Sequence, residues 1–286
     1  MEAKAPAFIL ANLGYDVWLG NNRGNKYSRN HMNINPNDKQ FWDFSFHEMG
    51  LLDIPAMVNF IQNETASDSG ELKKITYIGH SQGTCQFFAG MTLLPEFYEK
   101  SFNGMVALGP VSNLEFVESP LIRTLVNFHI DYIMDKVGFT ELLPDKYGLT
   151  TFEKFLCTNV PFVCNQILKA FSDDSTDDDD KDRFKVFVSH FPSGASYKSM
   201  SHFDQSIKTK SFATYGDMIP YDLTKPKNIK IALMVGGEDE LATVKDNRIF
   251  KELLEKNGLL NFYKEYELSG HLSFFISKSN DYMVDL

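Results

Sequence analysis

Short apolar runs alternate with amphipathic stretches near both ends of the chain. Five runs are predicted as strands: residues 15–19, 75–79, 105–108, 229–235 and 262–268, of which 75–79, 105–108 and 229–235 are mostly apolar. Helical periodicity, or the residues that begin and end helices, mark residues 6–13, a stretch after Ser45, residues 82–94 and residues 243–257. Strands that are apolar throughout and alternate with helices are typical of a parallel sheet covered on both faces. The pattern therefore predicts an α/β fold.

One predicted helix follows the long polar loop that starts at Gly20. Ser45 and Glu48 have the spacing of a capping box, in which each side chain accepts a hydrogen bond from the backbone N–H of the other residue. Pro55 is expected to kink this helix. Its apolar residues recur on one helical face, at Met49, Leu52, Ala56 and Phe60.

The alternation of strands and helices stops in the middle of the chain. This stretch holds aromatic-rich helical segments and a polar loop but no clear strand, so we expect an insertion that caps the sheet. The predicted organisation has three parts: the N-terminal part of the core at 1–110, the cap at 111–222 and the C-terminal part of the core at 223–286. With no internal repeat and no Gly/Ser linker, these parts are expected to pack as one body.

Composition narrows the possible functions. Hydrophobic residues make up 43% of the chain and charged residues 23%, which excludes a disordered or fibrous protein. The formal charge of -10 would repel a phosphate backbone, so we expect no nucleic-acid partner. No stretch approaches 18 uninterrupted apolar residues, and the first residues do not have the pattern of a signal peptide. Asn63 begins an N-glycosylation acceptor pattern, which matters only in a secretory protein.

No metal site is expected. Seven of the ten residues at 173–182 are Asp, but a calcium loop would have a central Gly and a closing Glu, so we interpret this run as a solvated loop. Cys85, Cys157 and Cys164 match no zinc pattern and are too few for a disulfide framework, although Cys157 and Cys164 could pair.

Residues 79–83 form the sequence Gly-His-Ser-Gln-Gly, a G-x-S-x-G element. A predicted strand ends on it and a predicted helix begins directly after it, which is the setting that a nucleophile elbow requires. Such a turn holds Ser81 in a strained conformation and brings backbone so close that side chains at Gly79 and Gly83 would clash. An ordinary glycine-rich turn has the same local pattern, so the assignment also depends on the partners of Ser81.

A serine nucleophile needs a histidine base that is oriented by a carboxylate. In hydrolases of this architecture the carboxylate and then the histidine follow the serine, each after a strand. Asp239 follows the predicted strand at 229–235, and His271 follows the one at 262–268. Other candidates are weaker by position: Glu238, Glu240 and Asp246, which is expected to cap the helix at Thr243, and His31, His47, His80, His129, His190 and His202.

These residues predict nucleophilic acyl transfer. His271 would accept the Ser81 proton as Ser81 attacks an ester carbonyl, and Asp239 would stabilise the charged imidazole. The backbone N–H of Gln82 is expected to be one oxyanion donor because it opens a helix. A second donor is expected from a loop after an earlier strand.

Runs of residues over nearly the whole chain match one family pattern. They are residues 7–11, 14–21, 23–25, 41–42, 44–46 and 79–84, then Ser189, His190, Pro192 and Gly194, then Gly236, Gly237 and Asp239. In these runs the chain resembles the acid lipase family that includes gastric lipase and lysosomal acid lipase. The resemblance implies an α/β-hydrolase fold with a lid-bearing, lipid-binding cap, and it places Ser81, Asp239 and His271 on the family's triad. It also implies triacylglycerol or sterol ester substrates at a lipid interface, an acidic lysosomal or secreted location, and no cofactor.

The chain departs from the family pattern at two places. Family members carry Asp two residues after the triad histidine, where this chain has Ser273. The family also begins with further strands and a His-Gly loop that provides the second oxyanion donor, and none of the seven histidines here precedes Gly. We therefore expect the chain to begin inside the domain, with N-terminal strands missing and a sheet edge unpaired.

Three functions are compatible with these features. The first is a serine ester hydrolase acting on neutral lipids, whose acyl site could be lined by Phe128, Phe139, Phe152, Phe155, Phe162 and Phe171. The second is a catalytically impaired homologue that binds lipid or a partner and lacks a complete oxyanion hole. The third is a serine peptidase of the same architecture, which the acid lipase runs disfavour.

Overall fold

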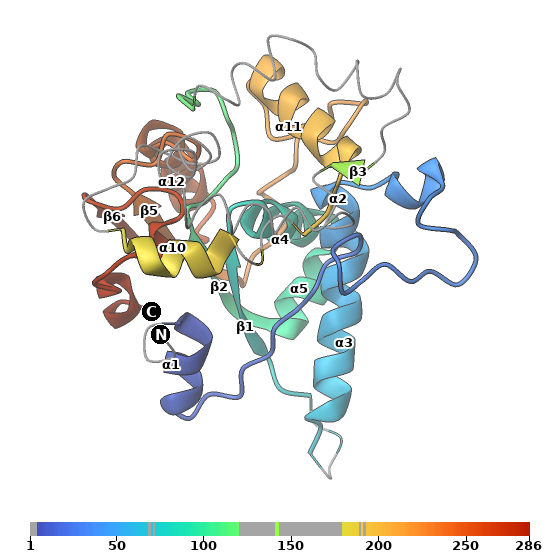
Figure 1. Ribbon diagram of the computed structural model, residues 1–286, viewed down its shortest axis with the longest axis horizontal. Helices are drawn as coiled ribbons and strands as arrows, with labels where there is room; N and C mark the ends of the chain where they lie inside the picture. The colour runs from blue at the N-terminus through green and yellow to red at the C-terminus, as the bar shows by residue number, and fades with distance from the viewer. Residues whose placement is uncertain are drawn as a thin grey trace.

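The computed structural model describes residues 5–67, 70, 72–119, 141–142, 179–188, 190 and 193–286 (Figure 1). Several residues named above lie outside these ranges: His129, Cys157, Cys164, Ser189, Pro192 and the six phenylalanines of the cap. Their proposed roles stay predictions.

The core is a four-stranded parallel sheet with the strand order β1-β2-β5-β6. Its strands are β1 (Ile75–His80), β2 (Phe102–Leu108), β5 (Lys230–Gly236) and β6 (Leu260–Tyr266). The predicted parallel α/β fold and four of the five predicted strands are confirmed. Because all four strands run the same way, their carboxyl ends lie along one edge of the sheet, where open α/β sheets bind ligands.

Successive residues of the central strands are buried on opposite faces of the sheet. In β2, Met105 and Ala107 belong to one hydrophobic cluster, whereas Val106 and Leu108 belong to another, as the two-residue period of a strand requires. The first face is covered by α4 (Gln82–Leu93), α5 (Pro95–Ser101) and α12 (Val244–Lys256). The second face packs against α13 (Ser273–Ile276) and the 3-10 helix η5 (Asp281–Val284). Burial on both faces explains why residues 104–108 of β2 and 231–235 of β5 are apolar without interruption.

The predicted strand at 15–19 is wrong. After α1 (Pro6–Asn12) this segment forms no strand pairing in the described part of the chain, and the side chains of Tyr15 and Leu19 are exposed. Trp18 makes an edge contact with Phe60, with ring centroids 6.0 Å apart. An apolar run forms a strand only where a neighbouring strand can accept and donate its hydrogen bonds, and no described strand offers that edge to these residues.

An irregular helix follows the 3-10 turn η2 (Lys39–Trp42). It consists of α2 (Phe46–Glu48), a π-helical segment (Met49–Asp53) and α3 (Ile54–Glu64). The predicted capping box is confirmed: the N–H of Ser45 donates to Glu48 Oε2 (2.7 Å), and the N–H of His47 donates to Ser45 Oγ (3.2 Å). The kink expected at Pro55 stays a prediction, and a π-helical segment ends just before that residue.

The predicted apolar face of this helix is wrong beyond Met49. Leu52, Ala56 and Phe60 are exposed, whereas Ile54 and Val58 are buried. A π-helical segment turns less per residue than an α-helix, so the residues after it are rotated relative to those before it. A periodicity counted at 3.6 residues per turn therefore selects the wrong side of α3.

Within residues 111–222, the predicted cap, the described residues form two short strands and two helices. They are β3 (Glu141–Leu142), β4 (Ala195–Ser196), α10 (Lys181–Val188) and α11 (Tyr197–Thr209). The expectation of no strand is wrong here, because β3 and β4 pair antiparallel. The loop interpretation of the Asp run is also wrong at its end, since Asp182 lies in the first turn of α10, where a carboxylate favours helix formation.

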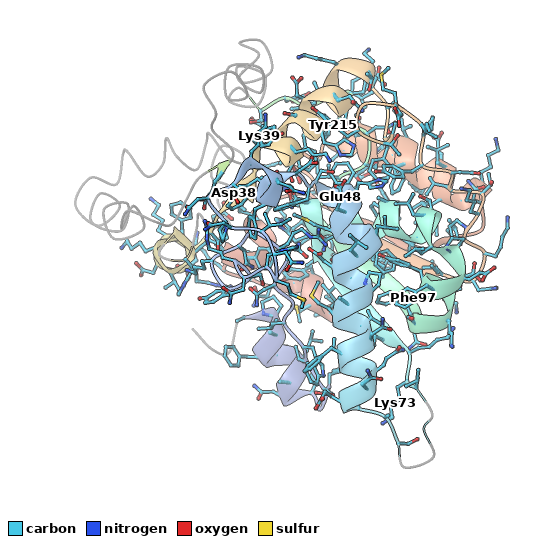
Figure 2. The ribbon with its side chains drawn as sticks, turned by 90° about the vertical axis from the view of Figure 1, so that its right-hand side faces the viewer. Asp38, Lys39, Glu48, Lys73, Phe97 and Tyr215 are labelled. Atoms are coloured by element: carbon cyan, nitrogen blue, oxygen red, sulfur yellow. The ribbon has the colours of Figure 1, made fainter. Side chains whose placement is uncertain are left out.

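A buried histidine joins α11 to α2. His202 Nε2 donates to the carbonyl oxygen of Ala213 (2.7 Å), its Nδ1 lies 2.9 Å from Ser45 Oγ, and its ring stacks on Phe46 with centroids 3.9 Å apart. Figure 2 labels Glu48, which belongs to α2, and Tyr215, whose ring centroid lies 5.6 Å from that of His202. Burial lowers the pKa of His202 to about 4, and the positive charges of His47 and Lys198 add to this. Among the described residues, no helix is long and apolar enough to cross a membrane.

Candidate active site

Ser81 lies on the turn between β1 and α4 and has a strained backbone. Its φ is 53° and its ψ is -122°, a combination that non-glycine residues rarely adopt and that costs about 1–3 kcal/mol. Hydrogen bonds from the N–H of Ser81 and to its carbonyl oxygen hold the turn. The N–H of Ser81 donates to the carbonyl oxygen of Leu108 (3.1 Å), and Thr84 Oγ1 donates to the carbonyl oxygen of Ser81 (2.6 Å). The predicted strand–turn–helix setting is present.

The two glycines of the element differ in how closely they are packed. A Cβ at Gly79 would lie 2.8 Å from the carbonyl oxygen of Gly83 and 2.9 Å from its carbonyl carbon, so the predicted clash is confirmed there. A Cβ at Gly83 would meet only Tyr77 Oη, at 3.6 Å, which is ordinary contact. The predicted clash at Gly83 is wrong, because the open side of Gly83 faces a side chain rather than backbone.

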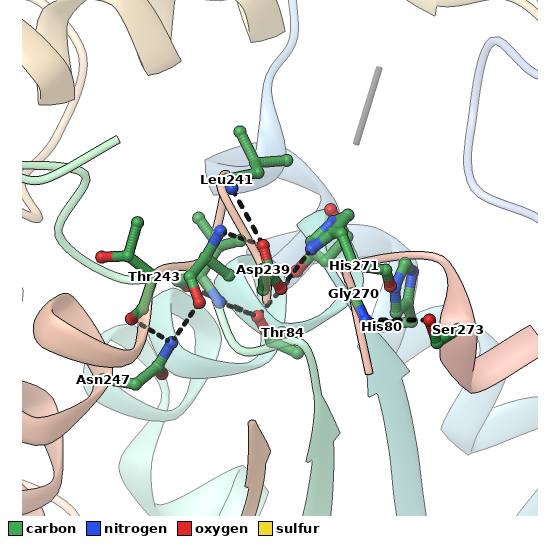
Figure 3. Close-up of polar contacts among 12 residues, drawn as sticks. His80, Thr84, Asp239, Leu241, Thr243, Asn247, Gly270, His271 and Ser273 are labelled. Atoms are coloured by element: carbon green, nitrogen blue, oxygen red, sulfur yellow. Dashed lines mark hydrogen bonds and ion pairs between the residues drawn. The ribbon is translucent and has the colours of Figure 1, made fainter. Parts of the chain in front are cut away.

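Asp239 and His271 form a buried pair at the carboxyl edge of the sheet (Figure 3). His271 Nδ1 lies 2.7 Å from Asp239 Oδ2, and both side chains are almost completely excluded from solvent. The other carboxylate oxygen, Oδ1, accepts from the N–H groups of Leu241 (2.9 Å) and Ala242 (2.6 Å). Because a carboxylate only accepts, Nδ1 carries the proton, and in the neutral ring Nε2 is then the basic nitrogen.

Two glycines at the end of β5 allow this pair to form. A Cβ at Gly236 would lie 2.5 Å from the carbonyl oxygen of Ser269, and a Cβ at Gly237 would lie 2.7 Å from the backbone of Glu267. Only glycine lets the loop after β5 approach the loop after β6 this closely. The approach brings Asp239 next to His271.

His80 connects this pair to the turn that carries Ser81. Its Nε2 lies 2.7 Å from the carbonyl oxygen of His271, and the two rings have centroids 4.7 Å apart. Since a carbonyl oxygen only accepts, His80 Nε2 carries the proton. Burial, together with the neighbouring His271, lowers the pKa of His80 to about 3, so the ring is neutral. The structure therefore places His271 beside the residue that precedes Ser81.

Gly109 lies directly against the buried pair, a role that sequence reasoning missed. Its φ is +51°, and a Cβ there would lie 3.1 Å from His271 Nδ1 and 3.4 Å from Asp239 Oδ2. The sequence showed only a Gly-Pro pair that ends a strand. The contact of His80 with His271 likewise has no local signal, because it joins the end of β1 to a loop 191 positions away.

Gln82 is the first residue of α4, so its N–H is one of the N-terminal groups that have no acceptor within the helix. This position suits an oxyanion donor, and the role stays a prediction. Within the described ranges, no group of three or more His, Cys, Asp or Glu side chains could hold a metal ion.

Of the alternative carboxylates and histidines, Asp246 and His47 have other hydrogen-bond partners and Glu238 is exposed. Asp246 accepts from Thr243 Oγ1 (3.0 Å) at the start of α12, as expected, and from the N–H groups of Glu115 and Phe116 (3.1 Å each). The Glu238 side chain is exposed. Among the histidines, His47 Nδ1 lies 2.8 Å from Tyr221 Oη.

Comparison with known proteins identifies the family to which the chain is similar. Residues 4–140 match the family described as the alpha/beta hydrolase fold. The chain is 33% identical to gastric triacylglycerol lipase of Rattus norvegicus, over 94% of this chain and 69% of that protein. It is 32% identical to lysosomal acid lipase/cholesteryl ester hydrolase of Homo sapiens, over 93% of this chain and 68% of that protein. It is also 32% identical to lipase member K of Mus musculus, over 95% of this chain and 70% of that protein. The chain belongs to the acid lipase family of α/β hydrolases, which includes gastric and lysosomal acid lipases.

Proposed function

We propose that this protein is a carboxylic ester hydrolase that cleaves neutral lipid esters, such as triacylglycerols or sterol esters, through Ser81, His271 and Asp239. The observation that carries this proposal is the buried 2.7 Å contact between His271 and Asp239 beside the strained turn of Ser81. The substrate class is supported by two relatives, one a triacylglycerol lipase and the other a cholesteryl ester hydrolase.

The reaction proceeds through an acyl-enzyme. His271 Nε2 takes the proton of Ser81 Oγ as that oxygen attacks the ester carbonyl carbon, and Asp239 stabilises the imidazolium that forms. The tetrahedral intermediate then breaks its bond to the alkoxy oxygen, which leaves as the alcohol with the proton from His271. A water molecule, deprotonated by His271, attacks the acyl-enzyme and releases the carboxylic acid and Ser81.

Oxyanion stabilisation begins at the N-terminus of α4. The N–H of Gln82 donates to the negative oxygen of the tetrahedral intermediate, and the positive end of the helix dipole adds to this effect. One such donor contributes on the order of 100- to 1,000-fold to turnover. The cap at residues 111–222 binds the lipid, and the protein works at a lipid interface in a lysosomal or secreted location, in line with its relatives.

The proposal is tested by hydrolysis of emulsified triolein and cholesteryl oleate, with an amide analogue of the same acyl chain as a third substrate. We expect ester cleavage by the wild type, a loss on the order of 10⁴-fold or more in Ser81→Ala, and no amide cleavage. Lipid binding without cleavage, unchanged in Ser81→Ala, would instead support the non-catalytic function.

A further inference from the structure

The end of the Asp run contacts the loop that carries His271. Ser273 Oγ donates to Asp179 Oδ1 (2.8 Å) and accepts from the N–H of Gly270 (2.8 Å), a bond drawn in Figure 3. The Ser273 side chain is buried. A continuous chain of hydrogen bonds therefore runs from the Asp179 carboxylate to the backbone of the residue that precedes His271.

Two backbone contacts join the same segments. Asp179 forms an isolated antiparallel bridge with Ser277, and the N–H of Asp180 donates to the carbonyl oxygen of Ile276 (2.7 Å). Asp180 Oδ1 in turn accepts from the N–H groups of Asp182 (2.9 Å) and Arg183 (3.2 Å) in the first turn of α10. The end of the run is thus fixed at one side to α13 and at the other to α10.

Helix α10 is held against the C-terminal segment that the end of the Asp run contacts. Arg183 is buried, and its Nη1 donates to the carbonyl oxygen of Ser277 (2.7 Å) and to Asn280 Oδ1 (3.1 Å). One position further on, Phe184 packs against Ile276. Figure 1 shows α10 beside the C-terminal segment of the chain. A buried guanidinium bound to main-chain oxygen does not shift easily, because moving it would leave its donors without acceptors.

We propose that Asp179 is a positioning residue for catalysis, which holds His271 in place through Ser273 and the N–H of Gly270. This inference rests on the proposed function, because it assigns His271 as the base. An O–H···O⁻ bond to an ionised carboxylate is about twice as strong as a bond between neutral groups. With His80 bound to the His271 carbonyl oxygen, the backbone around the base is fixed on both sides. A displacement of about 1 Å in such a group costs on the order of 100-fold in rate.

The test compares Asp179→Ala, Asp179→Asn and the matched control Asp182→Ala. Asp182 is the same residue type three positions away, and its side chain is 81% exposed. The readout is the second-order rate constant for fluorophosphonate labelling of Ser81, across a pH series and well below the melting temperature of each variant. We expect Asp179→Ala to label about tenfold more slowly, Asp179→Asn to recover most of the rate because it keeps an oxygen acceptor, and Asp182→Ala to match the wild type. A folded Asp179→Ala that labels at the wild-type rate overturns the proposal, as does an equal loss in Asp182→Ala.

A second readout separates this inference from the proposed function. The proton on His271 Nδ1, bonded to Asp239, is expected to give a downfield resonance, assigned by its absence in His271→Gln. It should broaden or move in Asp179→Ala and stay in place in Asp182→Ala, whether or not the wild type is labelled. An unlabelled wild type would refute the proposed function, whereas an unchanged resonance in Asp179→Ala would refute the positioning role. If Asp179→Ala does not fold, Ser273→Ala, which removes both hydrogen bonds, takes its place in both measurements.

Discussion

The ring of His80 donates its Nε2–H to the carbonyl oxygen of His271 across 2.7 Å, although 191 positions separate the two residues in the sequence. His80 is the last residue of β1 and His271 follows β6, and these are the two outer strands of the described sheet. The loop after β6 therefore crosses back over the ends of β5 and β2, and Gly109 leaves room for the His271 ring on the way. This path brings the proposed base to the turn of the proposed nucleophile.

The first prediction concerns this hydrogen bond. His80→Phe keeps an aromatic ring but removes the donor, so the His271 carbonyl oxygen loses its partner at a cost of about 1–3 kcal/mol. We expect the rate of fluorophosphonate labelling at Ser81 to fall at least tenfold. His31→Phe, at an exposed histidine, is the control and should label normally. Equal rates in both variants would show that the contact does not position the base.

The second prediction concerns the two glycines of the elbow. Gly79→Ala places its Cβ 2.8 Å from backbone and should lower the free energy of unfolding by about 1–3 kcal/mol. Gly83→Ala meets only ordinary contact, and alanine favours a helix over glycine by about 1 kcal/mol, so stability should stay equal or rise. Urea unfolding of the two variants measures the difference. A larger loss in Gly83→Ala would contradict the packing described.

The third prediction uses the strained backbone of Ser81. Ser81→Gly and Ser81→Ala both remove the nucleophile, but only glycine adopts a φ of 53° with this ψ without strain. We expect the glycine variant to have a free energy of unfolding about 1 kcal/mol above that of the alanine variant, even though glycine gains more conformational entropy on unfolding. Thermal and urea unfolding should agree on this order. The reverse order would mean that the turn relaxes in solution.

The fourth prediction concerns pH. The pKa of His202 is lowered from 6.5 to about 4, so between these values the unfolded chain binds more protons than the folded one. The free energy of unfolding should therefore fall as pH drops, with His202 contributing about 2 kcal/mol between pH 7 and pH 5. His202→Gln, which can still bond Ser45 and Ala213, should remove this part of the slope. An unchanged slope would mean that other groups cause it.

The sheet could be predicted from sequence because its central strands, β2 and β5, are buried on both faces, which gives them apolar runs such as residues 231–235. An apolar run wrongly predicted a strand at 15–19, because composition does not show whether a neighbouring strand is there to pair with it. Helical periodicity failed on α3, because the π-helical segment before it rotates the helix and a count of 3.6 residues per turn does not include that rotation.

The candidate site was only partly visible for a similar reason. Ser81, Asp239 and His271 follow strands, and chain order alone proposes them together. The residues that hold them, His80, Gly109 and Asp179, have no local signal, because each acts through a contact formed by distant segments. In the sequence, Asp179 does not differ from the other residues of an acidic run that predicts a solvated loop.

The most direct test of the central claim is labelling of the wild-type chain with a fluorophosphonate probe, with the adduct located by mass spectrometry and Ser81→Ala as control. The probe needs no choice of lipid, so it tests the nucleophile alone. We predict a single adduct on Ser81 that is absent from Ser81→Ala. In Asp239→Asn the rate of adduct formation should fall on the order of 10³-fold or more. No adduct on Ser81 in a protein shown to be folded would contradict the assignment of a working serine hydrolase site.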